Sequence, residues 1–251
     1  MNLNKKNILL TGASSGIGLE LAKNIAAEKC NLALLSRKVH VLEKLAAELS
    51  NSVSNVIAVK CDVSNKDEVL NAIEEVKRKF GNIDIAILNA GVGNFNPIQD
   101  FNSNKANKIL DVNVIGIIYC FEALLPGFIK NKSGVIVGVS SLADGRGFSG
   151  SGIYCASKAA VSIFLESMRV ELKKFNVKVI TVKPGFVKTP MTAVNDFAMP
   201  FLMNADKAAK IILSGIKKEK RIIQFPLPAV ISMKLLKLLP NSIFDIIAGQ
   251  V

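Results

Sequence analysis

Residues 7–29 read NILLTGASSGIGLELAKNIAAEK, in which a short apolar run, a glycine-rich turn and a helical pattern follow one another directly. Glycines at positions 12, 16 and 18 let the backbone turn tightly, approach a diphosphate closely and pack the next helix against a sheet. The amide groups at the start of that helix would face the phosphates. The stretch therefore predicts the first βα unit of a dinucleotide-binding sheet. For the turn alone, an ordinary glycine-rich connection is the alternative.

The same alternation of short apolar runs and longer helical patterns continues along the chain. Strands are predicted at residues 7–10, 31–35, 56–60, 84–88, 134–139, 178–182 and 221–225. Helices are predicted at residues 17–29, 39–49, 66–80, 102–130, 154–175 and 205–217. This pattern predicts an α/β fold, a single doubly wound (Rossmann) domain over residues 1–225 whose seven-stranded parallel sheet has helices on both faces. Residues 226–251 form an apolar, amphipathic C-terminal extension.

Residues that can carry chemistry follow six of the predicted strands. In a doubly wound sheet, ligands bind in the crevice beyond the carboxyl ends of the strands. The residues expected at this rim are the glycine turn, Arg37, Asp62, Asn89, Ser141 and the pair Pro184-Gly185. Because all six groups are expected at the same edge of the sheet, the sequence predicts that they belong to one binding site.

The segment after the second strand predicts which dinucleotide is bound. Leu34 to Lys38 contain no carboxylate that could accept hydrogen bonds from a ribose 2′-hydroxyl. Arg37, helped by Lys38 and Ser14, offers a guanidinium that suits a 2′-phosphate. The sequence therefore favours NADP(H) over NAD(H). A surface role for Arg37 at the start of a helix is the alternative.

Tyr154 and Lys158 are four residues apart at the start of a helical pattern, and Ser141 lies thirteen residues before Tyr154. The i, i+4 spacing puts the phenol and the ammonium on one helical face. There the cation would lower the pKa of Tyr154, and such a phenol can act as a general acid or base near neutral pH. A surface helix often carries such a pair, so the spacing alone is weak support for catalysis.

Together these residues resemble the short-chain dehydrogenase/reductase family, from about residue 5 to about residue 225. The matching elements are the Thr-Gly-x-x-x-Gly-x-Gly turn at 11–18, Asp62-Val63, Asn89-Ala90-Gly91, Asn113 within 111–114, Ser140-Ser141, Tyr154-x-x-x-Lys158 and Pro184-Gly185. Ser141 is preferred to Ser140 because its offset from Tyr154 matches the family pattern. The resemblance implies a nicotinamide-dependent oxidoreductase.

The resemblance also implies a role for each matched residue. Tyr154 would exchange a proton with the substrate oxygen, and Ser141 would hydrogen-bond the same oxygen. Lys158 would bind the nicotinamide ribose and lower the pKa of Tyr154, while Asn113 would hold a water in the proton relay. The implied cofactor-binding residues are Gly12, Ser14, Ser15, Gly16, Ile17, Gly18, Arg37, Asp62, Val63, Asn89, Gly91, Tyr154, Lys158, Pro184, Val187 and Thr189.

The substrate is predicted from the connection at 184–204, which is rich in Met and Phe. A long connection of this composition is expected to cover something apolar. A mobile lid over a hydrophobic ketone, aldehyde or alcohol is the preferred interpretation, and an insertion packed in the core is the alternative. The predicted enzyme is thus an NADPH-dependent carbonyl reductase or secondary alcohol dehydrogenase. A non-catalytic NADP(H)-binding regulator or scaffold of the same fold is the competing hypothesis.

The region before Tyr154 and the C-terminal extension depart from the family pattern. Arg146, in the loop at 144–149, could meet an anionic substrate or face solvent. Residues 229–239 are nearly all apolar, with Lys234 and Lys237 on one face. A helix there could lie on an anionic membrane surface, pack against a partner subunit or cover the protein's own substrate pocket. These alternatives stay open.

Composition limits the remaining function classes. The formal net charge is +12, but the basic residues are scattered and no reader motif accompanies them, so nucleic acid binding is not expected. Four isolated cysteines and a single histidine, His40, argue against a metal site and for a reducing, cytoplasmic location. No export signal and no apolar run of membrane-span length are recognised. A homodimer or homotetramer, paired through the helices at 102–130 and 154–175, is expected from the family resemblance.

Overall fold

Seven parallel strands form one sheet in the order β3-β2-β1-β4-β5-β6-β9. The strands are β1 (Asn7–Thr11), β2 (Asn31–Ser36), β3 (Asn55–Lys60), β4 (Ile85–Leu88), β5 (Gly134–Val139), β6 (Val177–Pro184) and β9 (Ile222–Phe225). The computed structural model describes residues 1–50, 55–93 and 96–248. All seven predicted strands are confirmed, with small shifts at their ends. The strand order reverses between β1 and β4, where sheets of this class bind ligands.

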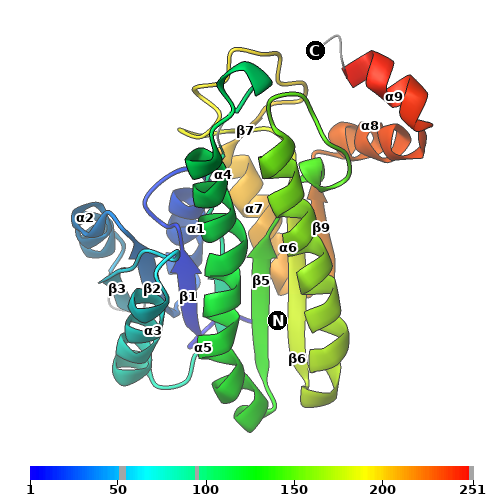
Figure 1. Cartoon of the computed structure of the whole chain (residues 1–251). Coiled ribbons are helices and arrows are strands. Elements are labelled where there is room, and N and C mark those ends of the chain that lie inside the picture. The colour runs from blue at the N-terminus through cyan, green and yellow to red at the C-terminus, as the bar shows by residue number, and fades with distance from the viewer. Residues whose placement is uncertain (51–54, 94–95, 249–251) are drawn as a thin grey trace.

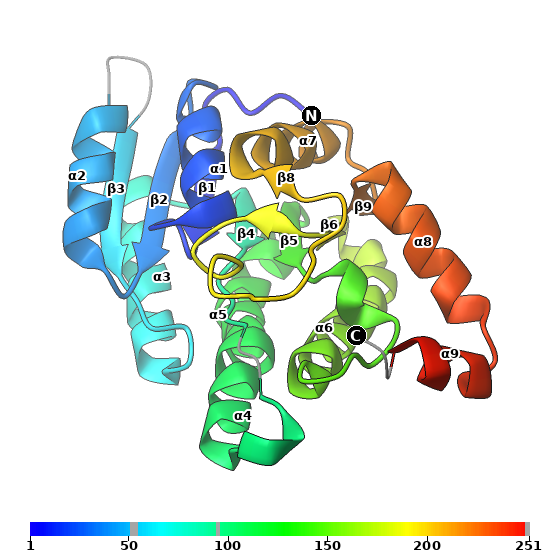
Figure 2. The same cartoon turned by 90° about the horizontal axis from the view of Figure 1, so that it is seen from above.

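Different helices cover the two faces of the sheet. In β1, Ile8 and Leu10 belong to one buried cluster and Leu9 to the other, because alternate side chains of a strand point to opposite faces. The helices are α1 (Gly16–Ala26), α2 (Val39–Leu49) and α7 (Ala205–Lys217) on the first face, and α3 (Lys66–Phe80), α5 (Gly116–Asn131) and α6 (Gly152–Glu171) on the second. Figure 2 shows α1 and α7 on one side of the sheet and α3, α5 and α6 on the other. Burial on both faces explains why the central strands β1, β2, β4 and β5 are nearly continuous apolar runs.

The long helix predicted at 102–130 is interrupted by a wider turn. α4 (Ser103–Leu110) leads into a π-helical turn (Asp111–Ile115), after which α5 continues to Asn131. Turns of this kind are frequent at functional sites, and this one contains the buried Asn113. The turn was not predicted, because it interrupts the hydrogen bonding of the helix without any change in residue composition.

The same helix corrects the expectation that no apolar run reaches the length of a membrane span. By length and composition alone, Ser103–Asn131 is long and apolar enough to cross a membrane, and half of its most apolar window is buried inside the protein. α5 packs against α3 and contributes Phe121 and Leu124 to the buried cluster. The apolar character of this helix therefore belongs to the core of the fold.

Two short strands outside the main sheet were not predicted. β7 (Val187–Lys188) and β8 (Met203–Asn204) pair in parallel and close the base of the connection at 185–204. Strands of two residues are too short to show an alternating apolar pattern. The pair joins the two ends of the segment predicted as a lid.

The C-terminal extension forms two helices, α8 (Leu227–Leu238) and α9 (Asn241–Ala248), which we call the C-terminal hairpin. Residues 249–251 of the predicted extension lie outside the described residues. α8 contacts β9 and the short 3-10 turn at Leu142–Asp144. Figure 1 shows the hairpin at the end of the sheet to which the strands point, on the side of β9.

The four cysteines are free and buried, as small core side chains. Burial raises the pKa of the Cys30 thiol to about 11 and that of Cys61 to about 12. Both thiols are therefore protonated at neutral pH.

Candidate active site

The glycine turn forms a narrow cradle at the carboxyl end of β1. Gly12 and Gly16 have φ values of +68° and +57°, which other residues rarely adopt. A Cβ on Gly18 would lie 2.1 Å from the Gly12 carbonyl oxygen, and one on Gly12 would lie 2.8 Å from the Ala90 Cα. The geometry therefore favours glycine at all three positions.

Asn89 and Thr11 hold this cradle in place. The Asn89 Nδ2 donates to the carbonyl oxygens of Thr11 and Gly12 at 3.1 and 3.2 Å. The Thr11 Oγ1 accepts from the backbone amides of Asn89 and Ala90, both at 3.0 Å. Asn89 thus shapes the crevice through the protein backbone.

The start of α1 lies at the mouth of the cradle. Within the described residues, the side chain of Ser15, the residue that precedes α1, makes no capping hydrogen bond. The first amide groups of a helix have no partner inside it, and together with the helix dipole they attract an anion. Ser14, Ser15 and Ile17 are at least partly exposed at this opening. These residues fit the diphosphate of a dinucleotide.

Arg37 and Asp62 meet at the ends of β2 and β3. The Arg37 Nη1 lies 3.7 Å from the Asp62 Oδ2, and the Arg37 side chain is 53% exposed. The backbone amide and the hydroxyl of Ser64 donate to the Asp62 Oδ1 at 3.0 and 2.7 Å. The carboxylate beside Arg37 therefore comes from the turn after β3, and the sequence did not predict this pair.

Tyr154, Lys158 and Ser141 converge at the ends of β5 and α6. The Tyr154 hydroxyl hydrogen-bonds to the side chain of Ser141. The Lys158 Nζ lies 5.8 Å from the centre of the Tyr154 ring and donates to the Val139 carbonyl oxygen at 3.1 Å. A Cβ on Gly91 would lie 3.3 Å from the Lys158 Nζ. The structure thus brings the three predicted residues together beside Gly91.

Burial controls the pKa values of this pair. It raises the pKa of Tyr154, and the hydrogen bond to Ser141 lowers this pKa in part. Burial also lowers the pKa of Lys158 from 10.5 to about 8. The predicted lowering of the Tyr154 pKa by Lys158 is wrong for this arrangement, because the amine bonds to Val139 and desolvation exceeds the effect of the distant charge.

Asn113 is fully buried in the π-helical turn, and the protein uses its amide group. The Oδ1 accepts from the Val92 amide at 2.8 Å, while the Nδ2 donates to the Val92 carbonyl oxygen at 2.9 Å and to the Ser157 Oγ at 3.0 Å. Since both amide protons are used, a relay water would have to donate to an oxygen of Asn113. Ser157 also donates to the Tyr154 carbonyl oxygen at 2.7 Å. Sequence reasoning missed Ser157, because a serine inside a helix carries no signal.

The connection at 185–204 lies against Gly93 through Met191, and Tyr154 lies near the same glycine. A Cβ on Gly93 would lie 3.2 Å from the Met191 Sδ and 3.7 Å from the Tyr154 Cδ2. The rings of Phe186 and Phe197 pack edge to face with their centres 6.0 Å apart. Val194, Phe201 and Leu202 are exposed. The segment therefore has both a packed side and an apolar outer side.

The three predicted nicotinamide-side residues lie where this connection begins. The Pro184 carbonyl oxygen is 3.5 Å from the Ser141 Oγ. Val187 is buried in β7, and its carbonyl oxygen accepts from the Thr192 hydroxyl at 2.7 Å. A Cβ on Gly16 would lie 3.0 Å from the Thr189 Cγ2. The segment thus spans from the glycine cradle to Ser141.

Arg146 contacts the C-terminal hairpin. This contact was not predicted, since the sequence suggested either binding of an anionic substrate or exposure to solvent. Its Nε donates to the Leu236 carbonyl oxygen at 3.2 Å and its Nη1 to the Asn241 Oδ1 at 2.8 Å. A further hydrogen bond reaches the Leu239 carbonyl oxygen. These contacts place Arg146 in the support of the hairpin.

The sequence matches the family model for short chain dehydrogenases over residues 6–198. The chain belongs to the short-chain dehydrogenase family. An oxidoreductase from Myxococcus xanthus is 36% identical over 245 residues, which cover 98% of this chain and 97% of that protein. The NADP-dependent 3-hydroxy acid dehydrogenase of Schizosaccharomyces pombe is 34% identical over 88% of this chain and 90% of its own. A family member from Burkholderia phymatum, solved in complex with NAD, superposes with a TM-score of 0.86 over 94% of both chains at 22% identity.

Membership of the short-chain dehydrogenase family accounts for the shared fold and for an oxidoreductase function. It leaves the choice of cofactor open, because the named relatives include an NADP-dependent enzyme and a structure with NAD. The glycine cradle and the uncapped start of α1 fit either dinucleotide.

A buried hydrogen-bond network supports α6 of this short-chain dehydrogenase. The Ser140 Oγ donates to the Lys158 carbonyl oxygen at 2.8 Å and lies 2.8 Å from the Ser162 Oγ. Ser162 also hydrogen-bonds to Asp144, which pairs with Lys183. Ser140 therefore binds the backbone of α6, while its neighbour Ser141 faces Tyr154. The sequence indicated the serine pair but not this division of roles.

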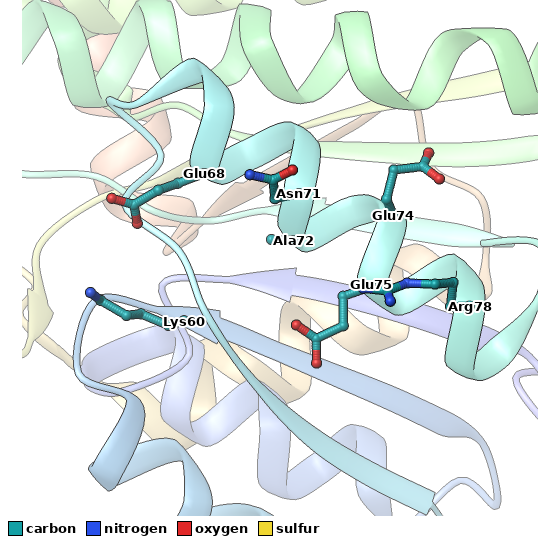
Figure 3. Close-up of a pocket in the computed structure, with 7 residues that line it drawn as sticks. All are labelled: Lys60, Glu68, Asn71, Ala72, Glu74, Glu75 and Arg78. Atoms are coloured by element: carbon teal, nitrogen blue, oxygen red, sulfur yellow. The ribbon is translucent and has the colours of Figure 1, made fainter.

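Two cavities differ in position and lining. The larger, of about 500 Å³, lies between the end of β3 and α3 and is lined by Lys60, Glu68, Asn71, Ala72, Glu74, Glu75 and Arg78 (Figure 3). Glu68, which lines this cavity, accepts a hydrogen bond from the Asp62 backbone amide at 2.9 Å. The cavity therefore lies next to Asp62. None of the predicted catalytic residues lines it. The second cavity, of about 400 Å³, reaches Ile153 beside Tyr154 and is lined by Asn96–Gln99, Phe101, Phe148–Gly150 and Gly152–Ile153.

Proposed function

We propose that this short-chain dehydrogenase is an NADP(H)-dependent oxidoreductase that interconverts a hydrophobic ketone or aldehyde and the corresponding alcohol. The hydrogen bond between Tyr154 and Ser141, with Lys158 beside them, is the observation that supports the proposal most. Two hydroxyl groups that point at each other can together hold one substrate oxygen. A carbonyl oxygen between them would accept both hydrogen bonds.

The protein residues would manage the proton of the reaction. Because burial raises the pKa of Tyr154, the phenol is protonated at neutral pH and can donate to the oxygen of a carbonyl as it is reduced. Ser141 would orient that oxygen through its own hydroxyl. When bound, NADP(H) supplies or accepts the hydride. Lys158, held by Val139, would turn to the ribose hydroxyl groups and approach Tyr154.

The preference for NADP(H) is supported by Arg37. Its guanidinium is partly exposed at the end of β2, and no carboxylate follows that strand in residues 34–38. The relative from Schizosaccharomyces pombe is named NADP-dependent. Asp62 lies 3.7 Å from Arg37 and would keep the guanidinium oriented until a 2′-phosphate binds.

A hydrophobic substrate is supported by the side chains around Tyr154. Met191 and Tyr154 both lie near Gly93, and the cavity next to Ile153 is lined by Phe101 and Phe148. Apolar lining with a few placed polar groups is typical of small-molecule sites. We also propose that the connection at 185–204 is a mobile lid. The protein is proposed to be located in the reducing cytoplasm.

The catalytic role of Tyr154 is tested by removing one oxygen atom. Tyr154→Phe should lower turnover of apolar ketones by about a thousandfold or more, because general acid catalysis is lost, while NADPH binding stays unchanged. Tyr119→Phe is the matched control, since Tyr119 is the other tyrosine of the chain and lies on α5. Turnover by Tyr154→Phe at the wild-type rate would contradict the proposal. Wild-type binding of NADPH without turnover of any carbonyl would favour the scaffold hypothesis.

The cofactor preference is tested by fluorescence titration with NADPH and NADH. Arg37→Ala should weaken NADPH binding by about tenfold to a hundredfold, the loss of one charge-assisted phosphate contact, and should leave NADH binding unchanged. Arg78→Ala, on α3, is the control. Equal loss for both nucleotides would contradict a role for Arg37 at the 2′-phosphate.

A further inference from the structure

The C-terminal hairpin is fixed to the body of the protein through its inner face. Arg146 hydrogen-bonds to Leu236 and Asn241, and its guanidinium carbon lies 4.6 Å above the centre of the Phe244 ring. The rings of Phe148 and Phe244 pack edge to face at 6.0 Å. α9 is therefore bound to the loop that precedes Tyr154.

α8 is fixed to the same loop by a second set of contacts. The Lys237 Nζ lies 3.7 Å from the carboxylate of the buried Asp144. A Cβ on Gly145 would lie only 1.7 Å from the Lys237 Cε, so the lysine stem packs directly on the loop backbone. Both helices thus present their outer faces in a defined orientation.

The outer face of the hairpin is apolar and exposed. Leu227, Ile231, Leu235 and Leu238 recur at i, i+4, i+8 and i+11 and share one face of α8. The residues that we call the apolar ridge are Leu227, Ile231, Leu235, Leu238, Ile243, Ile246 and Ile247, and their exposed fractions run from 45% to 81%. Together they form an exposed apolar surface that extends over two helices.

The two faces of α8 make this exposure unusual. Val230 on the inner face is buried, and Met233 and Leu236 are half-buried, so the helix is apolar on both sides. When a helix carries apolar side chains on two faces, both faces are normally covered. Large exposed apolar patches on soluble proteins mark contacts with another protein or a membrane.

Charge favours an anionic membrane over a second copy of the chain. Lys234 is exposed beside the ridge, one turn before Leu238, where its ammonium can reach lipid headgroups while its stem follows the apolar face. The whole chain carries a formal net charge of +12. A negatively charged bilayer attracts this charge, whereas two ridges packed against each other would bring their Lys234 side chains together without a counter-charge.

The ridge lies at the same end of the molecule as the substrate segment. Figures 1 and 2 show the hairpin and the connection at 185–204 beyond the ends of the strands. The exposed Val194, Phe201 and Leu202 belong to that connection. A bilayer against the ridge would therefore lie at the end of the molecule that carries the proposed lid.

We propose that the C-terminal hairpin is an interfacial docking surface, which inserts the apolar ridge into the headgroup region of an anionic lipid bilayer. Amphipathic helices of this kind lie in the plane of the interface, and their binding increases with buried apolar area and with anionic lipid. The proposal does not depend on the catalytic activity of the enzyme.

Co-sedimentation with lipid vesicles tests the docking surface on the full-length protein. The vesicles are phosphatidylcholine alone or phosphatidylcholine with roughly one third phosphatidylserine. Wild type should bind the anionic vesicles about tenfold more strongly than the neutral ones. Leu235→Ser combined with Leu238→Ser should reduce binding to the anionic vesicles by about tenfold or more. Ile246→Ser with Ile247→Ser should do the same from α9.

Two controls separate the ridge from general effects. Val41→Ser with Ile222→Ser removes two exposed aliphatic side chains from α2 and β9 and should leave vesicle binding unchanged. Tyr154→Phe should also bind as wild type, so that a failed catalytic proposal is told apart from a failed docking proposal. Wild type that stays in the supernatant with anionic vesicles would overturn the inference. Ridge variants that bind anionic vesicles as strongly as wild type would also overturn it. A protein that does not bind lipid, and whose ridge variants have a different oligomeric mass, would overturn it as well.

Discussion

Lys158 is placed at a cost to stability. The Lys158 residue is only 4% exposed, and burial lowers its pKa from 10.5 to about 8. A buried cation with one carbonyl partner is less well solvated than in the unfolded chain. The lowering corresponds to about 3 kcal/mol of destabilisation when the group is charged.

This cost predicts a stability gain on removing the charge. At pH 7, Lys158→Met should raise the free energy of unfolding by about 1–3 kcal/mol while abolishing turnover. The folded-state pKa is the lower one, so the folded protein holds fewer protons, and the penalty declines as pH rises from about 8 to 10.5. Denaturant unfolding at pH 7 and pH 10 measures both effects. Lys173→Met, at an exposed position, should change little, and a destabilised Lys158→Met would contradict the argument.

At the residue scale, the sequence predicted those site residues whose spacing along the chain follows from the reaction they would perform. The i, i+4 spacing of Tyr154 and Lys158 and the offset of Ser141 predicted three residues that the structure brings together. Ser157 and the pairing of Arg37 with Asp62 were missed. Such contacts depend on which strands and turns become neighbours in space, and no local spacing records that.

At the element scale, the loop at 144–149 and the C-terminal hairpin form one unit. Asp144, Arg146 and Phe148 each contact the hairpin. The same loop leads into α6 and therefore into Tyr154. The hairpin should then influence the substrate side of the site without touching the cofactor crevice.

Arg146→Ala tests this unit. Loss of hydrogen bonds to Leu236 and Asn241 should destabilise the hairpin locally by about 1–3 kcal/mol, since charged donors make the stronger bonds. Hydrogen exchange of residues 227–248 should rise by about tenfold or more, while the strands stay protected. Arg78→Ala, remote on α3, is the control. Unchanged exchange in the hairpin would show that Arg146 does not hold it.

Helices and strands were predicted correctly where their burial determines which residue types they contain. The central strands β1, β2, β4 and β5 are covered on both faces, so they are nearly continuous apolar runs and could be recognised. The π-helical turn at Asp111–Ile115 and the β7–β8 pair were missed, because a change in backbone hydrogen bonding leaves the composition of a short segment unchanged. The sequence indicated an apolar C-terminal extension. Its contacts with Arg146 could be seen only in the three-dimensional structure.

At the scale of the whole molecule, a second apolar surface lies away from the hairpin. Ile163 and Val170 are seven residues apart on one face of α6 and are 69% and 72% exposed. Ile118 on α5 is partly exposed as well. Short-chain dehydrogenases often pair through these two helices, so this face, and not the apolar ridge, is where we expect copies of the chain to meet.

This assignment predicts opposite results for the two surfaces. Ile163→Asp with Val170→Asp should convert an oligomer into a species of 27.0 kDa, because two charges per subunit would be buried without partners. Leu235→Ser with Leu238→Ser should leave the mass unchanged, since the ridge faces lipid. Light scattering coupled to gel filtration measures both, and thermal unfolding verifies that each variant is folded. A wild-type chain that is already monomeric would contradict pairing through α6. Loss of the oligomer only in the ridge variant would reverse the roles of α6 and the hairpin.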